Sequence, residues 1–264
     1  MRRKKTILSV FGKKMATQID AVVPLGPNDE DIVQRCIDSI YYHVANIRYV
    51  FVIAHRPIDL SNCIVLQESD FPFPREEVAK LTSEKRASWY LQQLIKLHAP
   101  LLISNILENV LIVDADTIFY KRTRFLENGK YYFDRVMEFP HQPYFEHMRR
   151  LHPSFEPWKR NVSGITNCMI FKKQFLQELM TTVEKHHKTD FWRAYLQCVD
   201  TTQNSGAAEY ELYFHWIMRN KSDQVKLRPL QWNNMGQRSK IGIHTGDWHY
   251  ISYHWHNQAK PLRY

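Results

Sequence analysis

A short apolar run that ends in two aspartates constrains this chain more than any other feature. Residues 110–113 read Val-Leu-Ile-Val, and Asp114-Ala-Asp116 follows directly. An uninterrupted apolar run is typical of a strand buried on both faces of a parallel sheet. Because side chains alternate along a strand, we expect Asp114 and Asp116 to point the same way if the strand continues through them. The sequence therefore predicts a carboxylate pair at the carboxyl end of a buried strand.

A carboxylate pair in this position suits metal-assisted chemistry on a phosphorylated ligand. Open α/β sheets bind ligands outside the carboxyl ends of their strands. Hard cations such as Mg²⁺ prefer oxygen ligands and bridge protein carboxylates to phosphate oxygens. For an isolated motif, a strand that ends in a solvated turn is an equally good interpretation, so the rest of the chain must decide.

Strands and helices alternate along most of the chain. The apolar periodicity predicts strands at 19–23, 49–53, 63–66 and 167–171, and helices at 32–44, 88–102, 173–186 and 207–219. We expect Asn28 to cap the first helix. From residue 228 onward no clear periodicity is visible. The pattern predicts an α/β protein: a single domain with a Rossmann-like mixed sheet flanked by helices.

The positive charge is concentrated at the N-terminus. The 264 residues carry a net charge of +9, and six basic residues without any acid precede residue 15: Arg2, Arg3, Lys4, Lys5, Lys13 and Lys14. Because 9 − 6 leaves only +3 for the rest, we interpret 1–15 as a basic tail and 16–264 as the folded domain. A solvated extension is the expected state of the tail, with contact to anionic lipid or nucleic acid as the alternative.

Several protein classes fit the remaining composition poorly. The apolar run 7–11 is too short for a signal peptide or a membrane span, and no run of 18 apolar residues follows. The four cysteines form no Cys-x-x-Cys pair, so we expect reduced thiols. The near-neutral body shows no nucleic-acid-binding motif. We therefore expect a cytoplasmic protein without a transmembrane segment or a nucleic-acid partner.

The ordered set of motifs resembles a known family. The segments that carry the resemblance are 21–24, 89–97, 113–117, 206–213 and 252–256. Together they are similar to nucleotide-sugar-dependent glycosyltransferases of the GT-A fold with an Asp-x-Asp metal motif, and among these to small bacterial and viral transferases. The resemblance implies a GT-A-like single domain, with a nucleotide-sugar half at about 16–120 and an acceptor half at about 121–264.

The resemblance also implies an activity and a metal. A sugar would pass from a nucleoside-diphosphate sugar, with UDP-sugars favoured and UDP-xylose a reasonable first trial, to a glycan acceptor. Mn²⁺ or Mg²⁺ would stabilise the charge that develops on the leaving diphosphate. Asp116 is expected on the metal, and Asp114 on the metal or on a ribose hydroxyl. His254 is expected to complete the metal shell, with His256 as the alternative because both share one strand face.

Further donor-binding residues are expected in the first strand and in the helix at 88–102. Val22 and Pro24 belong to the strand segment that carries the resemblance. Gln92 and Lys96 lie four residues apart, hence on one helix face. We expect Lys96 to neutralise phosphate and Gln92, or the glutamine after it, to bond the base or the ribose. Arg86 is a further phosphate candidate. A solvated helix face is the competing interpretation of this polar stripe.

Glu209 is the expected catalytic base of an inverting transfer. Such a base must face the anomeric carbon opposite the leaving group. Glu209 follows a turn of small residues at 204–208 and begins a helix, where interaction with the helix N-terminus is an equally good role. Glu211 and Asp200 are the alternatives, and a retaining enzyme would need no base. Tryptophans of the second half are candidates for an acceptor groove: Trp158, Trp192, Trp232 and Trp248.

Two other classes remain as alternatives. Residues 112–117 also match the nucleophile strand of haloacid-dehalogenase-like phosphatases, in which Asp114 would be phosphorylated. Those enzymes need a late Gly-Asp-x-x-x-Asp arrangement, and residues 246–251 lack its second acid. The non-enzymatic alternative is a basic-tailed nucleic-acid-binding protein, against which the near-neutral body speaks.

Overall fold

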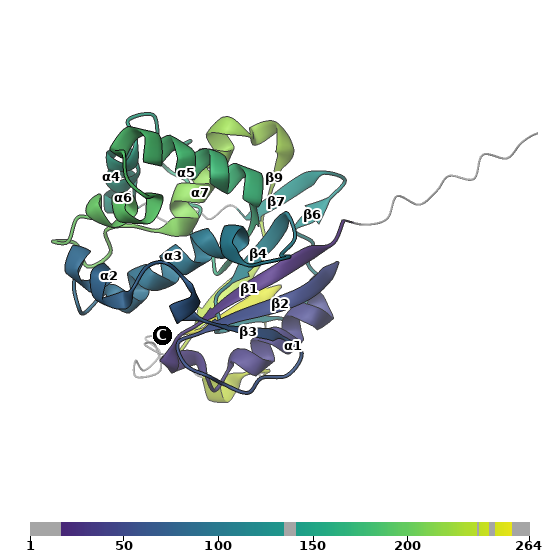
Figure 1. Ribbon diagram of the computed structural model, residues 1–264. Coiled ribbons are helices and arrows are strands. Elements are labelled where there is room, and N and C mark those ends of the chain that lie inside the picture. Colours follow the sequence, from purple (N-terminus) through teal and green to yellow (C-terminus); the bar gives the residue numbers. More distant parts are fainter. Residues whose placement is uncertain (1–16, 135–140, 237, 243–245, 255–264) are drawn as a thin grey trace, which may run out of the picture.

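The computed structural model describes residues 17–134, 141–236, 238–242 and 246–254 (Figure 1). The basic tail at 1–15 and His256 lie outside these ranges, so the predictions for them stay predictions. Within the described ranges, no helix has the length and apolar character needed to cross a lipid bilayer.

A five-stranded mixed sheet forms the centre of the domain, with strand order β3-β2-β1-β4-β8. The first four strands in that order are mutually parallel and β8 runs antiparallel to β4. Their bounds are β1 Ile19–Leu25, β2 Ile47–Ala54, β3 Ile64–Gln67, β4 Asn109–Val113 and β8 Cys168–Lys172. The chain winds outward from β1 to β3 and then returns to β4 on the other side of β1. Ligands bind at such switch points in open α/β sheets.

Helices cover both faces of this sheet. Helix α1 (Val33–His43) lies on one face, and α3 (Ala87–Leu102), α5 (Lys173–His187) and α7 (Glu209–Asn220) lie on the other (Figure 1). Every residue of β1 and β4 is consequently buried. That explains why both strands are predominantly apolar. The α/β fold class and the mixed sheet predicted from the sequence are confirmed.

Helix boundaries follow the predicted ones closely, with one correction. Helices α3, α5 and α7 begin and end within two residues of the expected positions. Asn28 does not cap α1, because a 3-10 turn at Pro27–Asp29 intervenes and Ile32 takes the cap position. The helices that the pattern did not predict are short: α2 Arg75–Leu81, α4 Gln142–Leu151 and α6 Phe191–Gln197.

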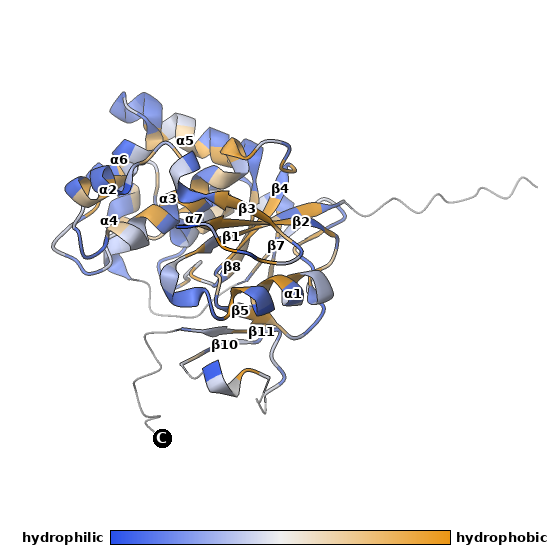
Figure 2. Cartoon of the chain, turned by 60° about the horizontal axis from the view of Figure 1, so that its bottom comes forward, coloured by the Kyte–Doolittle hydropathy of each residue, from blue (hydrophilic) through white to orange (hydrophobic). Residues whose placement is uncertain are grey.

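Two small sheets flank the central one. One has the order β10-β11-β5 and lies beside α1 (Figure 2), with bounds β5 Thr117–Phe119, β10 Trp232–Met235 and β11 Tyr250–Tyr253. The other has the order β6-β7-β9, with bounds β6 Leu126–Glu127, β7 Lys130–Asp134 and β9 Val225–Arg228. Because β11 pairs antiparallel with β5, the end of the described chain returns to the residues that follow Asp116.

Candidate active site

The two aspartates lie in a turn between the central sheet and the β10-β11-β5 sheet. Strand β4 ends at Val113, and the amide of Thr117 donates to the carbonyl of Asp114 at 3.0 Å. The strand therefore does not continue through the motif, so the condition under which strand alternation would align the two side chains is not met. The predicted position at the carboxyl end of β4 is correct, and it lies at the switch point between β1 and β4.

One buried lysine joins three parts of the fold. The ammonium of Lys96, in α3, lies 2.6 Å from Oδ1 of Asp114 and 2.7 Å from Oε1 of Glu209. Lys96 is only 4% exposed. Burial by itself lowers the pKa of a lysine, but the charges of Asp114 and Glu209 outweigh it and hold the pKa of Lys96 above its usual value. Lys96 is therefore charged and paired, and the solvated-face interpretation is wrong for this residue.

Asp114 has a second partner besides Lys96. The hydroxyl of Tyr210 donates to Oδ1 of Asp114 at 3.2 Å. Burial raises the pKa of Asp114, Lys96 opposes this, and the nearby charges of Asp116 and Glu209 raise it further. The side chain remains about a quarter exposed, so it can still meet a ligand at the edge of the sheet.

The polar residues of α3 hold the segment that leads to Glu209. Arg86 donates to Oγ of Ser205 at 3.3 Å, the hydroxyl of Tyr90 accepts from the amide of Gly206 at 3.2 Å, and Gln93 donates to the carbonyl of Ala207 at 3.3 Å. With Lys96 on Glu209, residues three or four apart on one helix face bind four of the five residues 205–209. This polar stripe is an internal interface.

One carboxylate oxygen of Asp116 is bonded, and the other has no contact of this kind within the described part of the chain. Its Oδ2 lies 2.8 Å from Nδ1 of His254, and the amide of Tyr253 donates to its main-chain carbonyl at 2.9 Å. Its Oδ1 is buried and has no hydrogen-bond partner among the described residues. A buried carboxylate oxygen without a partner is costly, which makes Oδ1 of Asp116 a candidate ligand atom. Burial lowers the pKa of His254, but the hydrogen bond to Asp116 and the surrounding acids raise it overall.

A clamp that the sequence did not predict lies next to Asp116. Arg238 forms ion pairs with Asp29 and Asp31 and donates to the carbonyl of Tyr253 at 3.2 Å. It thereby ties the residue before His254 to the loop after β1. Burial and the charge of Asp116 raise the pKa of Asp29 to about 6, against the opposing effect of Arg238. Because 209 residues separate Arg238 from Asp29, no local sequence signal could reveal the pair.

Whether the site fits a divalent cation depends on the ligands that lie around Oδ1 of Asp116. Among the described residues, no group of three or more His, Cys, Asp or Glu side chains is arranged to hold a metal. A metal caged by protein alone therefore does not fit these residues. A cation that keeps few protein ligands and takes the others from water and substrate phosphates does fit, since Mg²⁺ sites are commonly of that kind.

Four further residues were predicted to bind the nucleotide sugar, and they belong to β1 and to α3 with its N-terminal cap. Val22 and Pro24 are buried within β1. Gln92 is half-buried on α3, and Arg86 stacks its guanidinium 3.9 Å above the ring of Trp89. Arg86 therefore contacts the segment that leads to Glu209, and its guanidinium is engaged by Trp89 and Ser205. Binding of a nucleotide sugar by these four residues stays a prediction.

The alternative acids to Glu209 are both engaged elsewhere. Glu211 accepts from the hydroxyl of Ser163 at 3.0 Å, the amide of Gly164 at 2.6 Å and Nε2 of His215 at 3.2 Å. Asp200 accepts the amide and hydroxyl of Thr202 within its own turn. Both therefore have structural roles, and Glu209 is the acid that shares a partner with the Asp-x-Asp motif.

Two of the tryptophans considered for an acceptor groove pack within the protein. Trp192 is buried against Phe73, with ring centroids 6.3 Å apart. Trp232 stacks on Tyr250 at 5.8 Å with nearly parallel rings. Trp158 and Trp248 are partly exposed, as is Trp232, and an acceptor groove at these residues stays a prediction.

The fold is that of a GT-A-like protein. Mouse xyloside xylosyltransferase 1, in its apo form, is a solved structure that superposes with a TM-score of 0.50 over 93% of this chain and 100% of that chain, at 9% sequence identity. Identity this low shows the fold alone. Residues 16–243 match the model of a family of unknown function, DUF6492, and the chain belongs to that family. No curated protein gives a significant match.

Proposed function

We propose that this protein is a glycosyltransferase that moves a sugar from a nucleoside-diphosphate sugar to a glycan acceptor. The observation that carries the proposal is the buried oxygen of Asp116 that no described residue bonds, beside Asp114 at the switch point of a GT-A-like sheet. Switch points bind nucleotides, and a lone carboxylate oxygen suits a cation that bridges to phosphate. The name of the similar mouse enzyme supports a sugar as the transferred group.

In this proposal Asp116 holds a divalent cation, Mn²⁺ or Mg²⁺, on the donor diphosphate. When bound, the cation acts as a Lewis acid that stabilises charge on the departing nucleoside diphosphate. The hydrogen bond between Asp116 and His254 fixes the direction of the free oxygen. Such outer partners of a ligand carboxylate are characteristic of metal sites. His254 acts either as this partner or as a metal ligand.

Glu209 is the proposed base that takes the proton of the acceptor hydroxyl. The ion pair with Lys96 orients the carboxylate of Glu209 toward the cluster. Glu209 is only 5% exposed. Asp114, held by the same ammonium, is the residue that we propose bonds the ribose or the cation. Lys96 thus positions both acids, and its ammonium already has two carboxylate partners. The contact between Lys96 and phosphate stays a prediction.

UDP-sugars are the proposed donors, with UDP-xylose tried first because the mouse structure is that of a xylosyltransferase. A ligand that binds the folded state raises the apparent melting temperature. We expect one nucleotide sugar from a panel to stabilise the protein in the presence of Mn²⁺, and the stabilisation to disappear with chelator. Hydrolysis of simple phosphate esters without any response to nucleotide sugars would instead favour the phosphatase alternative.

A further inference from the structure

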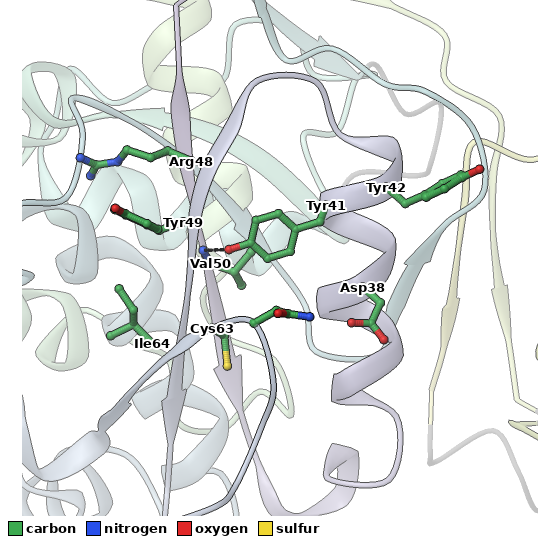
Figure 3. Close-up of a pocket in the computed structure, with 9 residues that line it drawn as sticks. Asp38, Tyr41, Tyr42, Arg48, Tyr49, Val50, Cys63 and Ile64 are labelled. Carbon is green, nitrogen blue, oxygen red and sulfur yellow. Dashed lines mark hydrogen bonds between the residues drawn. The ribbon is translucent and has the colours of Figure 1, made fainter.

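A wide hollow lies at the opposite end of the sheet from the carboxylates. It has a volume of about 640 Å³ and is lined by residues from the end of α1 and the beginnings of β2 and β3 (Figure 3). The ring of Tyr41 points from α1 toward β2, where its hydroxyl accepts the amide of Val50 at 3.1 Å. A second hollow, of about 420 Å³, adjoins the first and shares Arg48, Tyr49 and Ile64 with it. We call the two together the amino-end groove.

The exposed large apolar side chains of the described residues all line this groove. They are Tyr41, Tyr42, Tyr49, Ile64 and Leu102, and Tyr42 is 82% exposed. Single exposed apolar residues are common on proteins, but a contiguous group marks an interaction surface. Three of the five are tyrosines, whose rings favour the boundary between lipid and water.

The basic tail joins the fold beside the groove. The first strand begins at Ile19, which pairs with Ile47, and Asp20 forms an ion pair at 2.6 Å with Arg48 of the groove. The six basic residues of positions 2–14 precede this strand in the chain without an intervening acid. The largest concentration of positive charge in the sequence is therefore tethered within a few residues of the apolar surface.

A further basic residue belongs to the same end of the molecule. Thr123 bonds through its backbone to His43 and Ala45, the residues that flank the end of α1 next to Tyr42. Arg122, which precedes Thr123, is exposed. Arg122 thus adds a positive charge from the folded domain at the end of the molecule where the tail joins β1.

We propose that the amino-end groove and the basic tail together dock the protein on an anionic lipid surface. Basic residues near such a surface contribute about 1 kcal/mol each, but electrostatic attraction alone is screened by salt. Tyr42, Tyr49 and Leu102 supply the second, apolar contribution by entering the interface. Stable peripheral attachment generally needs two such signals.

The orientation that follows leaves the candidate active site open. The groove lies at the amino ends of β2 and β3, whereas Asp114 follows the carboxyl end of the parallel strand β4. A membrane at the groove therefore faces away from the carboxylates. The docking does not depend on the proposed sugar transfer, and either can fail without the other.

Vesicle flotation of the full-length protein tests the proposal. We expect binding to vesicles of phosphatidylcholine with about 30% phosphatidylserine and at least about tenfold weaker binding to phosphatidylcholine alone. The double variant Tyr42→Ser/Leu102→Ser should bind the anionic vesicles about tenfold more weakly, as should Lys4→Glu/Lys5→Glu. Gln177→Ser, an exposed change on α5, is the control and should bind like the wild type.

Three results would overturn the proposal. Unchanged vesicle binding by the Tyr42→Ser/Leu102→Ser variant would assign the attraction to the tail alone. Equal binding to neutral and anionic vesicles would remove the electrostatic part. A concentration-dependent dimer in analytical ultracentrifugation that the same variant abolishes, without vesicle binding by the wild type, would identify a second copy of the chain as the occupant.

Discussion

Nζ of Lys96 lies 2.7 Å from Oε1 of Glu209, although 113 residues separate them in the sequence. The same ammonium lies 2.6 Å from Asp114. One charge therefore links α3, the end of β4 and the start of α7. Because the pair is buried, removing one partner leaves an uncompensated charge, which typically costs about 3–5 kcal/mol.

We expect Lys96→Met to lower the free energy of unfolding by about 3 kcal/mol, because it leaves two carboxylates without their cationic partner. Adding Glu209→Gln should recover part of that loss, since the substitution removes one of the two unpaired negative charges. Urea unfolding of both single variants and the double variant measures the coupling as a double-mutant cycle. Lys121→Met, which breaks an exposed pair with Asp247, is the control and should change little. Strict additivity in the cycle would contradict the coupling.

Binding of UDP should depend on both a divalent cation and Asp116. We expect calorimetry with Mn²⁺ to show binding by the wild type and at least about tenfold weaker binding by Asp116→Asn, because an amide is a poorer cation ligand than a carboxylate. Asp200→Asn, a change in an exposed turn, provides a matched control and should bind normally. Equal affinity for UDP in the presence of chelator would show that binding does not require a divalent cation.

Glu209→Gln should separate binding from turnover. The amide keeps the size and a bond acceptor for Lys96 but removes the basicity. We expect UDP affinity to persist and turnover to fall by roughly 10²–10⁴-fold, the range that general-base catalysis supplies. The anomeric configuration of the product, read by NMR, is the accompanying measurement. A product that retains the configuration of the donor would rule out this role of Glu209.

His147 provides a test of the pH dependence of stability. Burial lowers its pKa to about 4, with a smaller opposing effect from the hydrogen bond that Nε2 donates to the carbonyl of Tyr195. In the unfolded chain a histidine protonates near 6.5. The unfolded state therefore binds the proton first, so the contribution of His147 is complete above pH 6.5 and declines as the pH falls toward 4.

We expect this decline to reach about 2–3 kcal/mol at pH 4.5. The free energy of unfolding is measured for the wild type and His147→Gln at pH 7 and pH 4.5. The comparison isolates the contribution of His147, because the opposing contributions of other groups, such as Asp134, are common to both proteins. NMR should show that the His147 ring does not titrate above about pH 5. A midpoint near 6.5 would mean that the ring is accessible to water.

A chain that begins at Met15 should fold and keep its turnover on a soluble acceptor. The described fold begins with β1 at Ile19, and the charge arithmetic sets the preceding residues apart. We expect the melting temperature and turnover of this shorter chain to match those of the full chain, while its vesicle binding declines. Failure to fold would show that the first residues pack against the domain.

The sequence predicts local elements well because their signals are local. The apolar run at 110–113 and the helical spacing around Leu91, Leu94 and Ile95 are sufficient to define β4 and α3. The position of Asp114 and Asp116 at a strand end follows from the same pattern. The turn at 114–116 does not, because β4 stops where the chain crosses to another sheet.

The composition of the site depends on contacts that no local pattern contains. The stripe of Gln92 or Gln93 with Lys96 was predicted to be a ligand-binding or a solvated face, yet Gln93 and Lys96 bind Ala207 and Glu209, which are more than 100 residues away in the chain. The polar residues are the same in both interpretations, and only the tertiary fold decides whether protein or solvent meets them. The clamp of Arg238 on Asp29 was missed for the same reason.

Cleavage of the donor tests the central claim most directly. Purified protein is incubated with UDP-sugars, Mn²⁺ and candidate glycan acceptors, and released UDP and the extended glycan are quantified by mass spectrometry for the wild type and Asp116→Asn. The account predicts equal amounts of UDP and extended glycan from one donor, and a loss of at least about a hundredfold in the variant because the charge on the leaving diphosphate is no longer stabilised. Transfer that is undiminished in Asp116→Asn, or no transfer from any nucleoside-diphosphate sugar, would contradict it.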